Sequence, residues 1–131
     1  AGAMVANHSS WLDIFALNAR APVVFVSKAE VARWPGIGLL ARATGTLFIR
    51  REARAEAQAQ ARAVAERLRA GQVLLFFPEG TSTDGRRVLP FKPALFAGLL
   101  DPALPAGLCV QPVTLDWRAP EGEDPRFYGW W

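Results

Sequence analysis

Short apolar runs alternate with longer helix-forming stretches along this chain of 131 residues. The clearest pair is a helix expected over residues 52–70, rich in Ala, Glu, Gln and Arg, and the apolar run 73–77 directly after it. A wholly apolar strand behind a helix is typical of a parallel sheet that is buried on both faces. The alternation therefore predicts an α/β fold, a largely parallel sheet flanked by helices.

The other expected elements follow the same order. The expected strands are 4–6, 23–26, 46–49, 73–77 and 108–115, and the expected helical segments are 11–20, 29–33, 37–43, 52–70 and 93–100. Pro112 has no N–H to donate to a neighbouring strand, which favours an edge position for the last strand. Functional loops of a parallel sheet lie at the carboxyl ends of its strands. Four loops qualify: those after residues 6, 49, 77 and 115.

Length and composition point to one folded domain. Hydrophobic residues make up 51% and charged residues 21% of the chain, which excludes disorder. No apolar run is long enough to cross a bilayer. The chain opens in an apolar stretch without a leader and stops in an aromatic one, so we expect residues 1–131 to be a single domain truncated at both ends.

The charge balance favours an anionic partner. Fifteen basic residues face 12 acidic ones, a net charge of +3, and all the basic residues except Lys28 and Lys92 are Arg. Because the charges scatter and the Arg-rich helix carries interspersed Glu, nucleic acid is not expected as a partner. One His and one Cys are too few for a usual zinc site, so no metal is expected. Cys109 lies in an apolar strand and is predicted to be a buried structural thiol.

His8 and Asp13 are the first candidate pair for chemistry. His8 lies in a polar loop before a predicted helix, and Asp13 lies three residues after Ser10, as in a capping box. A carboxylate bound to one imidazole nitrogen fixes the tautomer and raises the basicity of the other, which makes a general base. The alternative is an ordinary loop histidine beside a capping acid.

Two further strand ends carry polar residues. Glu79, Gly80 and Thr81 follow the apolar strand, where glycine can present backbone amides to a ligand and Glu79 can accept a bond from a substrate hydroxyl or orient an Arg. The alternative is a turn with a solvated Glu. Arg51 follows another strand in an Arg pair, and guanidinium binds phosphate in bidentate fashion. Solvated side chains are the alternative for this pair, and also for Lys28, Arg86 and Arg87.

Four segments, 7–13, 45–51, 77–81 and 110–113, together resemble the four sequence blocks of the glycerolipid acyltransferases of the PlsC type. His8 and Asp13 match the His-x4-Asp signature, and residues 77–81 match the Phe-Pro-Glu-Gly-Thr signature. The resemblance implies transfer of an acyl group from acyl-CoA or acyl carrier protein, without a cofactor, directly to a lipid hydroxyl. It implies that His8 is the general base, oriented by Asp13, and that Arg51, Glu79, Gly80 and Thr81 bind the acceptor. Lys28 resembles a basic residue that many members carry before the second block.

The third block departs from the family pattern. Family members continue with Arg and Ser after Thr, whereas this chain continues with Ser82 and Thr83 and reaches Arg86 and Arg87 only later. Either arginine can replace the missing phosphate ligand. The expected acceptor is 1-acylglycerol-3-phosphate, which would give phosphatidic acid. Because residues 81–92 are similar to relatives that acylate lyso-ornithine lipid, that acceptor is the alternative. A non-catalytic module that binds lipid or acyl carrier is a third possibility.

The resemblance also implies a membrane surface as partner, at the cytoplasmic face of the bacterial inner membrane. Trp11, Trp34 and several Arg would then meet an anionic bilayer. For Trp34, which is followed by Pro35 and Gly36, packing in the core is the preferred interpretation.

Overall fold

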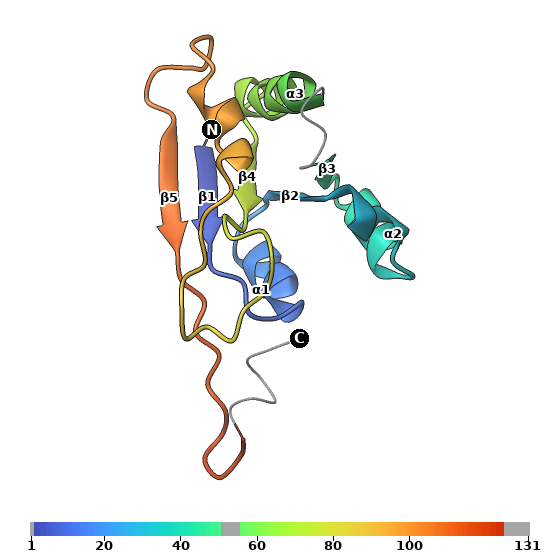
Figure 1. The fold of residues 1–131 in the computed structure, drawn as a ribbon, viewed down its shortest axis with the longest axis vertical. Helices are drawn as coiled ribbons and strands as arrows, with labels where there is room; N and C mark the ends of the chain where they lie inside the picture. The colour runs from blue at the N-terminus through green and yellow to red at the C-terminus, as the bar shows by residue number, and fades with distance from the viewer. Residues whose placement is uncertain (1, 51–55, 125–131) are drawn as a thin grey trace.

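One parallel sheet organises the part of the chain that the structure, a computed structural model, describes: residues 2–50 and 56–124. The strand order is β3-β2-β4-β1-β5, and every neighbouring pair is parallel (Figure 1). The strands are β1 Gly2–Ala6, β2 Val24–Lys28, β3 Leu47–Ile49, β4 Val73–Phe76 and β5 Cys109–Val113. The predicted α/β class is confirmed.

Helical segments connect the strands. They are α1 Leu12–Arg20, η1 Ala29–Arg33, α2 Ile37–Ala43, α3 Ala57–Arg69, η3 Pro93–Leu95 and η4 Ala97–Leu100. The expected helix over 93–100 is instead two short 3-10 turns, held by bonds such as Phe96 N–H to Pro93 O at 2.9 Å. Pro93 fits the first position of a helix, but Gly98 inside so short a segment disfavours an α-helix. Contact with α3 then fixes the tighter turns.

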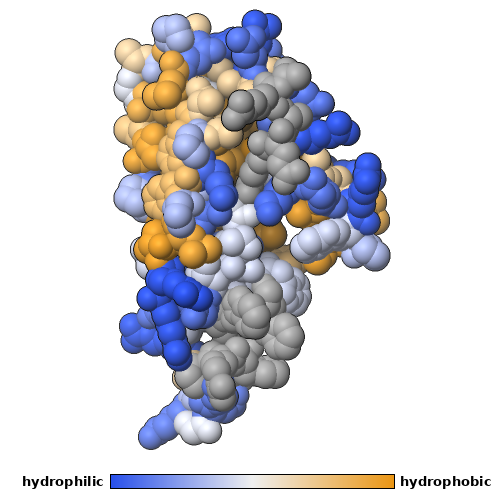
Figure 2. Space-filling model, in the orientation of Figure 1, coloured by the Kyte–Doolittle hydropathy of each residue, from blue (hydrophilic) through white to orange (hydrophobic). Residues whose placement is uncertain are grey.

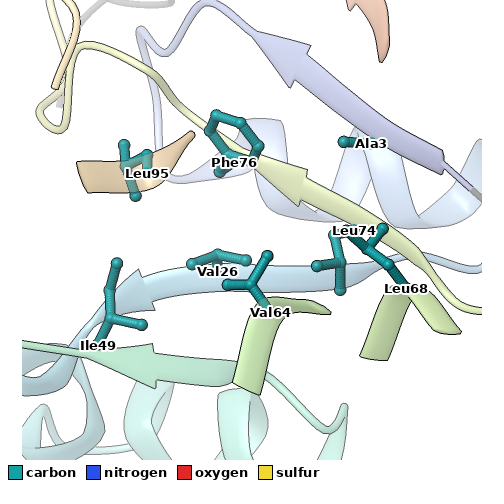
Figure 3. Packing of buried hydrophobic residues seen from close by; sticks show 8 residues of the cluster. All are labelled: Ala3, Val26, Ile49, Val64, Leu68, Leu74, Phe76 and Leu95. Atoms are coloured by element: carbon teal, nitrogen blue, oxygen red, sulfur yellow. The ribbon is translucent and has the colours of Figure 1, made fainter. Parts of the chain in front are cut away.

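Hydrophobic clusters lie on both faces of the sheet because side chains alternate along each strand. On one face Leu74 and Phe76 of β4 pack with Val64 and Leu68 of α3 (Figure 3). On the other face Leu75 packs with residues of α1 and β2. The central strand β4 is therefore covered from both sides, as its apolar sequence predicts.

Gly98 lets η4 lie against α3. A Cβ atom at this position would lie 2.5 Å from Cβ and Cγ1 of Val64 and 2.8 Å from the carbonyl oxygen of Ala61. Only glycine permits this approach without displacement of the neighbouring helix.

Two predictions of burial are wrong. β5 lies at the edge of the sheet, as Pro112 predicted, but Cys109 at its start is exposed because only β1 lies beside this strand. Trp34 is 53% exposed rather than packed in the core. It caps the C-terminal end of η1, a segment that contributes no buried residue.

Candidate active site

The sheet order places the loop after β1 between two others. β1 lies between β4 and β5, and parallel strands end at the same edge, so the His8 loop is flanked by the segments that follow Phe76 and Val113. Hydrogen bonds join all three. Thr83 N–H donates to the His8 carbonyl at 2.8 Å. The Asn7 amide bonds both backbone groups of Leu115, at 2.8 and 2.7 Å.

His8 and Asp13 are in contact, as the sequence predicts. Nδ1 of His8 lies 2.8 Å from Oδ2 of Asp13. The imidazole stacks on the Phe77 ring, with 4.0 Å between the centroids and 13° between the planes. The His8 side chain is 19% exposed, whereas that of Asp13 is fully buried. Because Asp13 holds Nδ1, Nε2 is the nitrogen that can accept a proton from a bound hydroxyl.

The Asp13 carboxylate is bound entirely by N–H groups. Oδ2 also accepts the backbone N–H of Ser9 at 2.8 Å and of Ser10 at 3.0 Å. Burial raises the pKa of Asp13, but the bonds from His8, Ser10, Trp117 and Ser9 lower it further, so the pKa lies below its ordinary value of 3.8. Asp13 is therefore ionised at neutral pH.

The start of α1 holds this pair in place. α1 begins at Leu12 with Trp11 as its N-cap, one residue later than the capping-box spacing predicts. Half of the expected exchange is present, because Asp13 accepts the N–H of Ser10, whereas Ser10 Oγ accepts the N–H of Leu12 at 3.2 Å. The same carboxylate thus binds a backbone amide just before the helix and orients His8.

Trp117 is a member of the site that the sequence analysis missed. Its Nε1–H donates to Oδ1 of Asp13 at 2.5 Å, across 104 positions of the sequence. Trp117 follows β5, the neighbour of β1, so only the strand order reveals that its indole can reach the His8 loop.

The loop after β4 is closed by its own contacts. Glu79 is buried, and its Oε2 accepts the N–H of Leu89 at 2.7 Å. Lys92 N–H donates to the carbonyl of Pro78 at 2.8 Å. Gly80 has a φ of 76°, a conformation that favours glycine, and its N–H closes a turn to Phe77 O at 3.0 Å. Thr81 is exposed.

A hollow of about 390 Å³ opens in this loop. It is lined by Ser82, Thr83, Asp84, Arg87 and Leu89. Arg87 lines this hollow and Arg86 does not, although both side chains are exposed.

The other expected binding residues lie further along the edge. Lys28 ends β2, two strands from β1, which is about 10 Å by the usual strand spacing. Arg51 lies outside the described residues. Its neighbour Arg50 follows β3 and pairs with Glu56 at 3.5 Å. The structure thus brings His8, Asp13 and the loop after β4 together, and leaves Lys28 apart from them.

Two features are absent from residues 2–50 and 56–124. In these ranges no three His, Cys, Asp or Glu side chains are grouped as ligands for a metal ion. No helix there has both the length and the apolar character needed to span a membrane.

Comparisons with known proteins find related acyltransferases. A family model described as Acyltransferase matches residues 2–116. A lyso-ornithine lipid O-acyltransferase from Rhodobacter capsulatus is 63% identical over 99% of this chain and 47% of its own length. A 1-acyl-sn-glycerol-3-phosphate acyltransferase from Neisseria gonorrhoeae is 42% identical over 92% of this chain and 46% of its own length.

A solved structure agrees as well. The crystal structure of the 1-acyl-sn-glycerophosphate acyltransferase PlsC from Thermotoga maritima matches with a TM-score of 0.55 and 32% identity, over 75% of this chain and 39% of that one. The chain spans about half the length of the curated relatives that it matches. With the family model covering most of the sequence and the His8–Asp13 pair in its expected place, the chain belongs to the Acyltransferase family.

Proposed function

We propose that the protein transfers a fatty acyl group from a thioester to the hydroxyl of a lysolipid. The observation that carries this proposal is the contact between His8 and a buried, ionised Asp13, which leaves Nε2 as a base at the carboxyl edge of the sheet. The relatives named above are acyltransferases that act on such acceptors, as their names state.

In the proposed reaction Nε2 of His8 takes the proton of the acceptor hydroxyl. The oxygen attacks the thioester carbonyl, and the C–S bond breaks as the ester bond forms. The departing thiolate takes the proton back from His8. Ser9 and Ser10, the hydroxyl groups next to His8 in sequence, are buried, which supports direct transfer without an acyl-enzyme. The donor would be acyl-CoA or acyl carrier protein, with no cofactor.

Two acceptors have specific support. The relative with 63% identity is named for lyso-ornithine lipid, and the relative with 42% identity for 1-acyl-sn-glycerol-3-phosphate. The match of Arg51 to the second block supports a phosphate ligand, and Glu79, Gly80 and Thr81 would shape the loop that receives the acceptor. A binding module without activity is disfavoured, because His8 and Asp13 are both present and in contact.

We also propose that the start of α1 faces a lipid surface, at the cytoplasmic face of the bacterial inner membrane. Trp11 and Phe15 are 47% and 45% exposed and form an edge-to-face pair with centroids 5.6 Å apart. Exposed aromatic residues of this kind favour the boundary between water and lipid. They lie within two residues of Asp13 in sequence, at the start of the helix that carries it, so a lipid surface there would be close to the His8 loop.

The test measures thiol release from acyl-CoA and from acyl carrier protein by the full-length protein, with each lysolipid offered separately. His8→Ala is expected to lower kcat about a hundredfold or more, because proton transfer is lost. Asn18→Ala, a change at an exposed position of α1, is the matched control and should leave turnover unchanged. Turnover near the unmodified level in His8→Ala would refute the mechanism.

A further inference from the structure

The hollow in the loop after β4 contains one group of each charge. Asp84 and Arg87 both line it, and they do not form an ion pair with each other among the described residues. Figure 2 shows hydrophilic residues gathered at the lower left, below a band of hydrophobic residues, where Figure 1 draws the lower end of this loop. The two charges are therefore available to a ligand.

Local hydrogen bonds order the loop around the hollow. Asp84 Oδ1 accepts the N–H of Arg86 at 3.1 Å, which holds the carboxylate and leaves Oδ2 for a ligand. Thr83 Oγ1 accepts the N–H of Gly85 at 3.2 Å. At the far wall, Leu89 is held by the buried Glu79. Because the loop is already ordered, less conformational entropy is lost when a ligand binds to it.

The hollow is also connected to the proposed base. Thr83, one of its lining residues, donates its backbone N–H to the carbonyl of His8 at 2.8 Å. Thr83 is next to Asp84 in sequence, so a headgroup bound by Asp84 and Arg87 would lie close to the His8 loop. The rest of the same lipid could then reach Nε2 of His8.

Charge complementarity distinguishes the two acceptor classes. A phosphomonoester carries only negative charge, so it would pair with Arg87 but be repelled by Asp84. A headgroup with one carboxylate and one ammonium satisfies both, because guanidinium binds carboxylate in bidentate fashion and carboxylate accepts from ammonium. Resting on the proposed function, we propose that this hollow binds the acceptor headgroup and selects a zwitterionic amino-acid headgroup over a phosphomonoester.

The experiment compares two substitutions in the full-length protein. Asp84→Asn removes the charge but keeps an oxygen for the Arg86 N–H, and Arg87→Gln removes the guanidinium. Each is expected to raise KM for lyso-ornithine lipid about tenfold and to leave kcat unchanged, because a charge-assisted bond is lost outside the reacting atoms. Asp84→Asn should lower KM for 1-acylglycerol-3-phosphate. Arg62→Gln, an exposed change on α3, is the matched control.

A binding series separates this proposal from the proposed function. In a His8→Ala background, each lysolipid is titrated below its micelle concentration while tryptophan fluorescence is followed. Lyso-ornithine lipid should bind more tightly than 1-acylglycerol-3-phosphate, and Asp84→Asn should remove that preference. If the unmodified protein acylates neither lipid, the proposed function fails, while this series still decides the headgroup. Equal binding of both lipids, or no effect of Asp84→Asn on either, would overturn the proposal.

Discussion

Trp117 and Asp13 should be energetically coupled. Trp117→Phe removes the one hydrogen bond that Oδ1 of Asp13 accepts among the described residues, a bond to a buried, ionised carboxylate. Such bonds contribute about 1.5–3 kcal/mol. We therefore expect the free energy of unfolding to fall by about 2 kcal/mol. In the acyl-transfer assay Trp117→Phe should lower kcat and leave KM for the acceptor unchanged, because Trp117 contacts Asp13, which orients His8.

Asp13→Asn tests the same contact from the other side. Its Oδ2 accepts three N–H groups and its Oδ1 accepts one, so an asparagine that keeps its oxygen at the Oδ2 position must point its own NH₂ at the indole N–H. Two donors then face each other. In the Asp13→Asn background, Trp117→Phe removes one of these two donors. The substitution should then lower the free energy of unfolding only by the small amount that comes from burying a smaller ring. The coupling free energy in the double-mutant cycle should be about 1–2 kcal/mol.

The cycle is measured by urea unfolding of the full-length protein, followed by far-ultraviolet circular dichroism. Trp34→Phe is the matched control, because Trp34 is exposed and its substitution should change stability by less than about 0.5 kcal/mol. Additivity of the two single substitutions within about 0.5 kcal/mol would refute the coupling and reduce Trp117 to a packing residue.

Two more predictions concern acid stability and packing. Because the pKa of folded Asp13 lies below its ordinary value of 3.8, its stabilising contribution is complete above that pH and is lost as the pH falls toward the folded pKa. Urea midpoints between about pH 3 and pH 7 should therefore fall less on acidification in Asp13→Asn than in the unmodified protein, and parallel curves would contradict this. Gly98→Ala should lower stability by about 1–3 kcal/mol, since the new Cβ meets Val64 at 2.5 Å. An unshifted melting temperature in Gly98→Ala would show that α3 and η4 separate easily.

Local features of the sequence were enough to predict most elements and the contact between His8 and Asp13. Apolar periodicity located the strands and the long helix, because burial of β4 on both faces leaves a continuous apolar run. The spacing of Ser10 and Asp13 predicted the helix start to within one residue, and with it the contact to His8, because both depend on residues within one turn.

Features that depend on distant neighbours were not predictable in this way. Cys109 sits in an apolar run, yet its exposure depends on β5 lying at the edge of the sheet. Trp34 is a large apolar residue of the kind usually found in a core, but it is exposed and the segment η1 before it has no buried residue. Trp117 joins the site only because β5 pairs with β1, which no short window of sequence contains.

The position of β1 also determines when the site can be assembled. Gly2 pairs with Val73 on one side and with Cys109 on the other, so the first of these five strands to leave the ribosome finds its partners only after most of this chain has been made. Contacts this far apart in sequence slow folding. His8 therefore gains its environment last: Phe77 arrives with β4, and the indole of Trp117 follows β5. β1 is thus made before either of its partner strands, and the indole of Trp117 reaches Asp13 only when β5 has docked.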